Sequence, residues 1–199
     1  SSTQLLITSM TSFAYTAHLC FNLAWLNCYL RGDRWGLTVT PWIGFFALGL
    51  HNPFTHALFV TPWLLGLVRK RQWRVTLYFA TVYLAGCIVW YLWMRYTRPS
   101  MVSGADLQIF QLPGLYQMFI QPMNLSLVFS WQSPATSILF IAAVRHWAAL
   151  SPLNKKLFWG CFLTFSFYFF FPWDQFIGWG YRFFYGVLGN FILIAVAGW

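Results

Sequence analysis

The sequence is poor in charge, and in negative charge above all. Of its 199 residues 8% are charged, and its only acidic side chains are Asp33, Asp106 and Asp174, with no glutamate. Soluble globular domains carry roughly 25% charged residues, so this chain has too few to cover a soluble surface. Hydrophobic residues make up 59% and aromatic residues 23%, a composition that excludes a disordered chain. The composition therefore predicts an integral membrane protein.

Three further features are missing: paired cysteines, a basic stripe apart from the apolar segments, and a starting methionine or signal peptide. The four cysteines form no close pair and lie in apolar stretches, which predicts small buried hydrophobic residues and not a disulfide or metal framework. The net charge of +9 forms no basic stripe apart from the apolar segments, so we expect no nucleic-acid partner and assign the charge to membrane topology. The chain begins without a methionine or a signal peptide, and its last apolar run, residues 186–199, is shorter than the roughly 20 residues of a full span. We expect residues 1–199 to be one transmembrane domain that is truncated at both ends.

Apolar runs between basic clusters predict an all-α, polytopic transmembrane bundle of about six or seven membrane segments. The pair 36–50 and 57–68 is short for spanning, so a re-entrant hairpin is the alternative to two full spans. The stretch 97–123 places proline, glycine and glutamine between apolar residues, which predicts an amphipathic element in the membrane interface around 100–121. The expected segments are residues 3–30, 36–50, 57–68, 75–96, 124–150, 157–172 and a final run from 184.

The basic residues predict which side of the membrane each loop occupies. If each segment crosses once, nine of the twelve lysines and arginines fall on one side, which the positive-inside rule makes cytoplasmic. The three on the outer side are Arg95, Arg98 and Arg182. His51, His56, Asp106 and Asp174 are expected on the same outer side, so we expect the active surface to face outward.

Residues 172–183 contain the pattern that is most typical of a site. Asp174 and Arg182 lie eight residues apart around Trp179 and Tyr181. An arginine fork suits phosphate oxygens, and an aspartate could orient it or accept a proton. Aromatic faces beside such a loop suit a sugar ring or a lipid headgroup. The alternative interpretation is an aromatic belt at the membrane interface with one charge pair.

Histidines supply the other candidate groups. His51 and His56 lie on the connection between the two short segments, where a turn would let them converge on an acceptor or a phosphate; the alternative is that they cap the hairpin. A metal site would need a third ligand, for which Asp174 is the candidate. We predict no metal and no cofactor, and a divalent metal stays an open alternative. His18 and Asn22, four residues apart in an apolar segment, predict a polar pair in the bundle interior.

Three stretches of the sequence together resemble a known family. They are residues 8–11 with His18-Leu and Asn22-Leu-Ala-Trp25; Leu48-Gly-Leu-His-Asn-Pro53 with His56, Phe59, Pro62 and Arg71-Gln-Trp-Arg74; and Gly178-Trp-Gly-Tyr-Arg182 with Tyr185-Gly186 and Leu188-Gly-Asn190. The proteins they resemble are uncharacterised bacterial polytopic proteins related to the GT-C glycosyltransferases, which take sugars from polyprenyl-phosphate donors. Two departures accompany the resemblance. Ile177 stands where the group often has histidine, and no acidic residue precedes Asp33, although GT-C enzymes usually place their catalytic aspartate in the first outer loop.

The resemblance implies inverting sugar transfer at the periplasmic face of the bacterial inner membrane. It implies a catalytic aspartate upstream of this chain, with Asp174 as a weaker candidate, and as partners the membrane lipids and a polyprenyl-phosphate-linked sugar. The donor phosphate is assigned to Arg182, Arg95 and Arg98, and substrate binding to His51, His56, Trp179 and Tyr181. A transporter or channel and a non-enzymatic assembly subunit are the alternative functions; vesicle uptake would separate the first from an enzyme. The sugar, the acceptor and the oligomeric state are left open.

Overall fold

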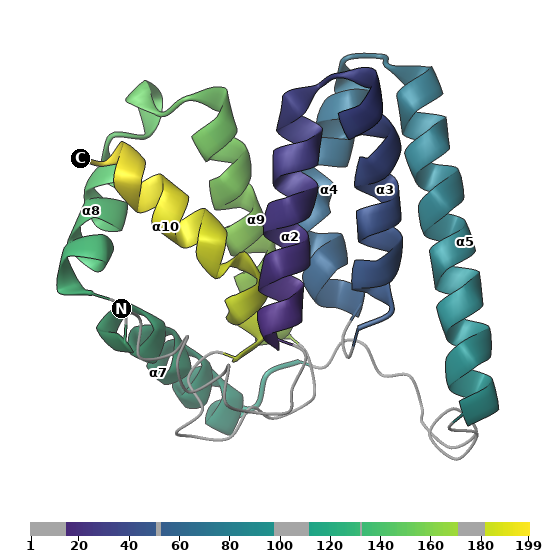
Figure 1. The fold of residues 1–199 in the computed structure, drawn as a ribbon. Helices are drawn as coiled ribbons and strands as arrows, with labels where there is room; N and C mark the ends of the chain where they lie inside the picture. Colours follow the sequence, from purple (N-terminus) through teal and green to yellow (C-terminus); the bar gives the residue numbers. More distant parts are fainter. Residues whose placement is uncertain (1–14, 51–52, 98–111, 132, 171–181) are drawn as a thin grey trace.

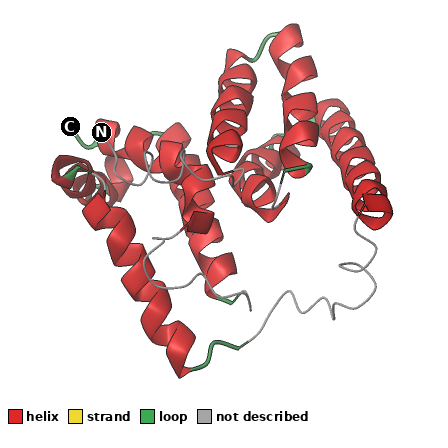
Figure 2. Cartoon of the chain, turned by 60° about the horizontal axis from the view of Figure 1, so that its bottom comes forward, coloured by secondary structure: helices red, strands yellow, loops and turns green. Residues whose placement is uncertain are grey.

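A computed structural model of the chain describes residues 15–50, 53–97, 112–131, 133–170 and 182–199. Within these ranges the chain is all-α, as the sequence predicts, and contains no strand (Figures 1 and 2). The elements are α2 (Tyr15–Arg31), α3 (Arg34–Leu48), α4 (Pro53–Arg69), α5 (Trp73–Thr97), α7 (Leu115–Trp131), α8 (Pro134–Arg145), the 3-10 helix η1 (Trp147–Ala149), α9 (Pro152–Phe169), the 3-10 helix η2 (Arg182–Val187) and α10 (Leu188–Ala197).

Helices α2, α3, α4, α5, α8 and α9 run up and down between two ends of a bundle, whereas α7 lies across its lower end (Figure 1). α2, α3, α4 and α5 form one half, and α8, α9 and α10 form the other (Figure 1). Contacts of α4 with α9 and of α2 with η2 join the halves. The turns after α2, α4 and α8 lie at the end drawn uppermost in Figure 1, which we call the basic end because the lysines and arginines of residues 31–34, 69–74 and 145–156 lie there. α2, α4 and η2 begin at the opposite end.

The turns between the helices form at glycine, proline and helix-capping residues of the sequence. Between α2 and α3, Gly32 adopts a left-handed backbone with φ of +66°, a conformation that glycine adopts without a steric penalty. Asp33 then caps α3, because its carboxylate accepts a hydrogen bond of 2.7 Å from the backbone N–H of Gly36. Ser151 caps α9 in the same way, and Pro152 begins that helix. The basic tetrapeptide 31–34 is therefore a complete helix-stop and helix-start signal.

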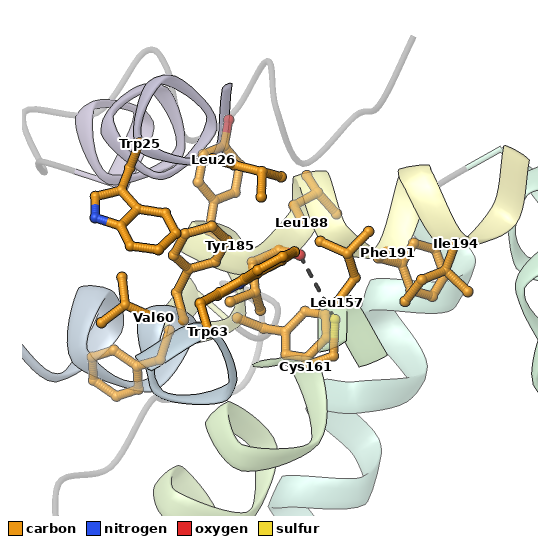
Figure 3. Packing of buried hydrophobic residues seen from close by; sticks show 14 of the residues in the cluster. Trp25, Leu26, Val60, Trp63, Leu157, Cys161, Tyr185, Leu188, Phe191 and Ile194 are labelled. Atoms are coloured by element: carbon orange, nitrogen blue, oxygen red, sulfur yellow. Dashed lines mark hydrogen bonds between the residues drawn. The ribbon is translucent and has the colours of Figure 1, made fainter. Parts of the chain in front are cut away.

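Aromatic and aliphatic side chains from both halves meet in one core. Figure 3 shows Tyr185 of η2 lying among side chains of α2 and α4, close to Leu188. Trp25, Trp63 and Tyr185 are each at most 2% exposed, and the core continues through Leu157, Phe191 and Ile194 into the second half. In the same region the thiol of Cys161 points at the carbonyl of Val187, at 3.8 Å. The segment 183–190 is thus buried at the centre of the molecule.

The expected segment 75–96 is confirmed as the helix α5, which is the one described helix long and apolar enough to cross a membrane by itself. The expected segment 124–150 is wrong as one continuous helix. It is divided between α7 and α8, which are bent by 112° relative to each other, and counts as a second span only if the bent pair is taken as one. Pro134 explains the break, because the residue before a proline is turned away from helical geometry and proline favours the first position of a new helix.

Two other expectations are adjusted by the structure. The amphipathic element expected around 100–121 lies partly outside the described residues, and its described part, from Leu115, continues as α7 to Trp131. Of the cysteines, Cys161 is buried as expected, but Cys20 and Cys87 are exposed on the bundle surface, because they occupy outward positions of α2 and α5. The short segments 36–50 and 57–68 become the antiparallel helices α3 and α4.

Candidate functional site

A group of polar side chains is buried where α2, α4, α9 and η2 meet, with one partner from α5. Burying a polar group without a hydrogen bond costs roughly 1–3 kcal/mol, so the bonds among these groups decide whether the arrangement is stable. His18, Thr55 and His56 are 0% exposed and Asn22 is 1% exposed. We call the following set the polar cluster: His18, Asn22, Thr55, His56, Tyr83, Tyr168 and the backbone carbonyl of Gly186.

Asn22 links helix α2 to η2 and to α4. Its Nδ2 donates to the carbonyl of Gly186 at 2.8 Å, and a carbonyl can only accept, so the orientation of the amide is fixed. The Oδ1 of Asn22 therefore faces His56, whose Nδ1 lies 2.7 Å away. Because that oxygen is an acceptor, the proton of the His56 ring must lie on Nδ1.

Tyr83 completes the surroundings of His56. The indole Nε1 of Trp25 donates to the Tyr83 hydroxyl oxygen at 2.7 Å, and the same oxygen lies 3.2 Å from Nε2 of His56. With its proton on Nδ1, His56 accepts at Nε2, so the hydroxyl proton of Tyr83 is donated there. An unbroken series of donors and acceptors thus runs from Trp25 through Tyr83, His56 and Asn22 to Gly186, and it requires no charged group.

Gly186 is the point at which several elements approach one backbone. A Cβ atom at this position would overlap the methyl group of Thr55 and would lie 3.7 Å from the Cβ of His18. Glycine is therefore required for α2 and α4 to lie this close to η2. The hydroxyl of Thr55 is 3.3 Å from that of Tyr168, whose ring stacks on Phe183 with centroids 4.3 Å apart, so α9 is joined to the same point.

A second contact holds the segment that follows η2. The side-chain amide of Asn190 donates to the carbonyl of Leu157 at 3.1 Å. A Cβ at Gly160 would lie 2.8 Å from that amide nitrogen, so a glycine again provides the space. Residues 186–190 are in this way fixed to α2 on one side and to α9 on the other.

The structure places the sequence-predicted site residues in three different situations. His56 lies inside the bundle, with both ring nitrogens bonded to protein groups and not open to a substrate. Arg182 is the first residue of η2, next to the buried segment. Arg95 is exposed in the last turn of α5, a helix that packs on α3 and α4, so it is not brought to η2. Outside the described residues lie His51, Arg98, Asp174, Trp179 and Tyr181.

The prediction of an interior position for His18 and Asn22 is confirmed, since both are fully buried. Sequence reasoning missed Tyr83 and Tyr168, which are single hydroxyl residues within apolar runs, and Thr55, which lies in the connection 51–56. Their pairing depends on contacts between residues up to 113 positions apart, which no local spacing reveals. The cost of an intramembrane polar group was the one available signal, and it applies to Tyr83 and Tyr168, which lie within the expected segments 75–96 and 157–172.

The described part of the chain contains no cluster of side chains that could hold a metal ion. No three side chains of histidine, cysteine, aspartate or glutamate lie close enough there to hold an ion. Two histidines alone are too few for the three or four protein ligands of a typical zinc site. Asp174, the third ligand that the sequence suggested, is outside the described residues.

The hydrogen bonds of the polar cluster join α2, α4, α5 and η2 to one another. Asn22, His56 and Tyr83 have their polar atoms engaged with protein groups, and the bond from Asn22 fixes η2 at Gly186, four residues after Arg182. Comparisons of the chain with the models of known protein families, with curated proteins and with solved structures found no match.

Proposed function

We propose that the chain is part of a multi-pass membrane enzyme that transfers a sugar from a polyprenyl-phosphate donor to an acceptor at the outer face of a bacterial inner membrane. One observation carries the proposal. The three stretches that resemble the GT-C group are far apart in the sequence, yet residues from all three meet in the polar cluster: Asn22 from the first, His56 from the second and Gly186 from the third. Residues that only packed against lipid would have no reason to converge.

The membrane location has its own support. Leu77 and Leu84 of α5 and Ile138 of α8 each expose more than half of their surface. Large apolar patches on a water-exposed surface mark an interface or lead to aggregation, whereas a bilayer accommodates them. Helix α5 is long and apolar enough to cross a membrane, and nine of the twelve lysines and arginines lie at the basic end. A bundle of six or seven membrane segments accounts for this charge distribution.

Arg182 is the proposed donor-phosphate group. In inverting transfer the acceptor oxygen attacks the anomeric carbon of the sugar, and the bond from that carbon to the phosphate oxygen breaks. The electron pair leaves with the lipid phosphate, and the acceptor proton goes to the aspartate expected upstream. A guanidinium stabilises the charge that grows on the phosphate. Arg182 is the first residue of η2, which is anchored through Gly186, and η2 begins at the end of the bundle opposite the basic end, where the outer loops are expected.

The test is the Arg182→Ala variant of the full-length protein, with Arg34→Ala as the matched control at the basic end. Transfer of radiolabelled sugar from the polyprenyl-phosphate donor is measured in membranes, alongside the amount of protein inserted. We expect Arg182→Ala to lower the rate by about 10²–10³-fold, the usual cost of losing one group that stabilises transition-state charge, with normal insertion. Arg34→Ala should retain the rate. Unchanged transfer by Arg182→Ala would refute the assignment.

A further inference from the structure

A groove lies between α4 and α9 at the basic end, remote from η2. Its volume is about 380 Å³. The side chains of Leu65, Trp159 and Leu163 form an apolar wall, while Arg69 and Lys156 bring positive charge to it. Leu65 and Trp159 are exposed, so the wall is open to the surroundings of the bundle. The groove therefore offers cations at the end of the bundle and an apolar surface directly below them.

Lys156 is folded into this groove and does not extend away from it. Its Nζ lies over the ring of Trp63, 4.9 Å from the centroid. A Cβ at Gly66 would be 2.8 Å from that nitrogen, so the bare backbone of α4 makes room for it. Burial, and after it the neighbouring charge of Lys70, lower the pKa of Lys156. The ammonium is thus held in partial desolvation beside a like charge.

No acidic side chain of the described residues balances these charges. Asp33 is the one carboxylate side chain in the described ranges, and it is paired with Arg31 at 2.8 Å. Helix stability does not explain Lys156 either, because a cation in the first turns of a helix opposes the helix dipole. The positive-inside rule explains why lysines occur at this end, but a loop position would satisfy that rule equally well.

We propose that the groove binds an acidic phospholipid, whose phosphate is held among Arg69, Lys70 and Lys156 and whose acyl chain lies along Leu65 and Trp159. Charge complementarity favours an anionic headgroup. The three cations lie at the basic end, where the lipid headgroups are expected, and the anion present there is a phosphate group. The apolar wall selects a lipid over a soluble phosphate ester. The inference shares the membrane location with the proposed function and is independent of sugar transfer.

The test compares spin-labelled phosphatidylglycerol with spin-labelled phosphatidylcholine bound to the purified full-length protein. Loss of one lysine near an anionic lipid should reduce the preference for phosphatidylglycerol by about fivefold, so Lys156→Gln should show this loss. Lys155→Gln is the matched control. Its ammonium lies 5.8 Å from the centroid of Trp147 and donates to the carbonyl of Ala148 at 3.5 Å, outside the groove, so the preference should stay unchanged.

A second variant tests the shape of the site. Gly66→Leu fills the groove, removes no charge and favours the helix, and we expect it to lose the preference while remaining monodisperse. Equal losses in Lys156→Gln and Lys155→Gln, or no loss in Lys156→Gln, would overturn the proposal. Glycerol 3-phosphate is the remaining arm: if it displaces the labelled lipid at equal ionic strength, the groove binds a soluble phosphate and the proposal is wrong. Sugar transfer, assayed separately, has no bearing on these outcomes.

Discussion

The hydroxyl of Tyr83 is the group whose removal tests the polar cluster most directly. Tyr83→Phe deletes one oxygen atom and leaves the ring, so no large cavity is created. Two contacts are lost: the bond from the Trp25 indole at 2.7 Å and the bond to His56 at 3.2 Å. Trp25 and His56 are both 0% exposed, so water does not readily replace the missing oxygen.

The expected magnitude follows from the environment of these two bonds. In a soluble protein each buried group left without a partner costs about 1–3 kcal/mol, which for two groups gives roughly 2–6 kcal/mol. In a bilayer the unfolded helices also find partners, and measured pairs average about 0.6 with a maximum of about 1.7 kcal/mol. For a membrane bundle we therefore expect Tyr83→Phe to lower the free energy of unfolding by about 1–3 kcal/mol.

Reversible unfolding by sodium dodecyl sulfate in mixed micelles measures this free energy. Tyr78→Phe is the matched control on the same helix. Its hydroxyl also makes two bonds, accepting from Trp42 at 3.0 Å and donating to the carbonyl of Thr38 at 2.9 Å, but both are exposed near the basic end, where water replaces the oxygen. The control should lose less than about 1 kcal/mol. If Tyr83→Phe is as stable as the unmodified protein, the inferred series of hydrogen bonds does not exist.

Three further predictions concern the same bundle. In Gly44→Ala the new Cβ would lie 2.7 Å from Nε2 of His56, and overpacking should cost about 1–3 kcal/mol in the same unfolding titration; a neutral result would mean that the helices separate easily. Asn22→Leu keeps a similar volume but strips the partners from two buried groups, so a loss of about 1–3 kcal/mol is expected, and no loss would argue against the assigned amide orientation. The backbone N–H of Gly36 is the main cause that lowers the pKa of Asp33 below its ordinary value of 3.8. A lowered pKa in the folded state means that the stabilisation is present above the unfolded pKa and disappears as the pH falls through the folded pKa. Asp33→Asn, which can still cap the helix, should therefore lose less melting temperature than the unmodified protein between pH 7 and pH 3, and equal losses would contradict the assignment.

The helix ends were predictable because charge and turn chemistry are local. Arg31-Gly-Asp-Arg34 contains a left-handed glycine and a capping aspartate, and α2 and α3 end and begin within it. Helix α4 ends and α5 begins within the basic cluster 69–74, where the run of charged residues marks the boundary between two apolar segments. A break at Pro134 was predictable on the same local grounds. The expected segment 124–150 instead followed the apolar character of the stretch alone.

The site was predictable only in its isolated parts. An apolar setting and a spacing of four residues are enough to predict that His18 and Asn22 face the interior. Nothing local connects Asn22 to Gly186, because their separation of 164 residues is closed by helix packing alone. His56 was expected to bind an acceptor or a phosphate, or to cap the hairpin, whereas packing supplies its partners from α2 and α5. Tertiary contacts therefore decide the composition of the polar cluster.

The two anchors of the segment after Arg182 have a consequence for the evolution of this protein. The carbonyl of Gly186 is bound to α2 and the side chain of Asn190 to α9, so both residues must reach their partners at once. Adding or removing one residue between them would rotate one anchor away by about 100°, given the 3.6 residues of a helical turn. The length of this interval is therefore fixed by its two anchors, in addition to the packing of the buried Val187 and Leu188 between them. Relatives of the chain should accordingly carry insertions in turns such as 70–72 and none between the glycine and the asparagine.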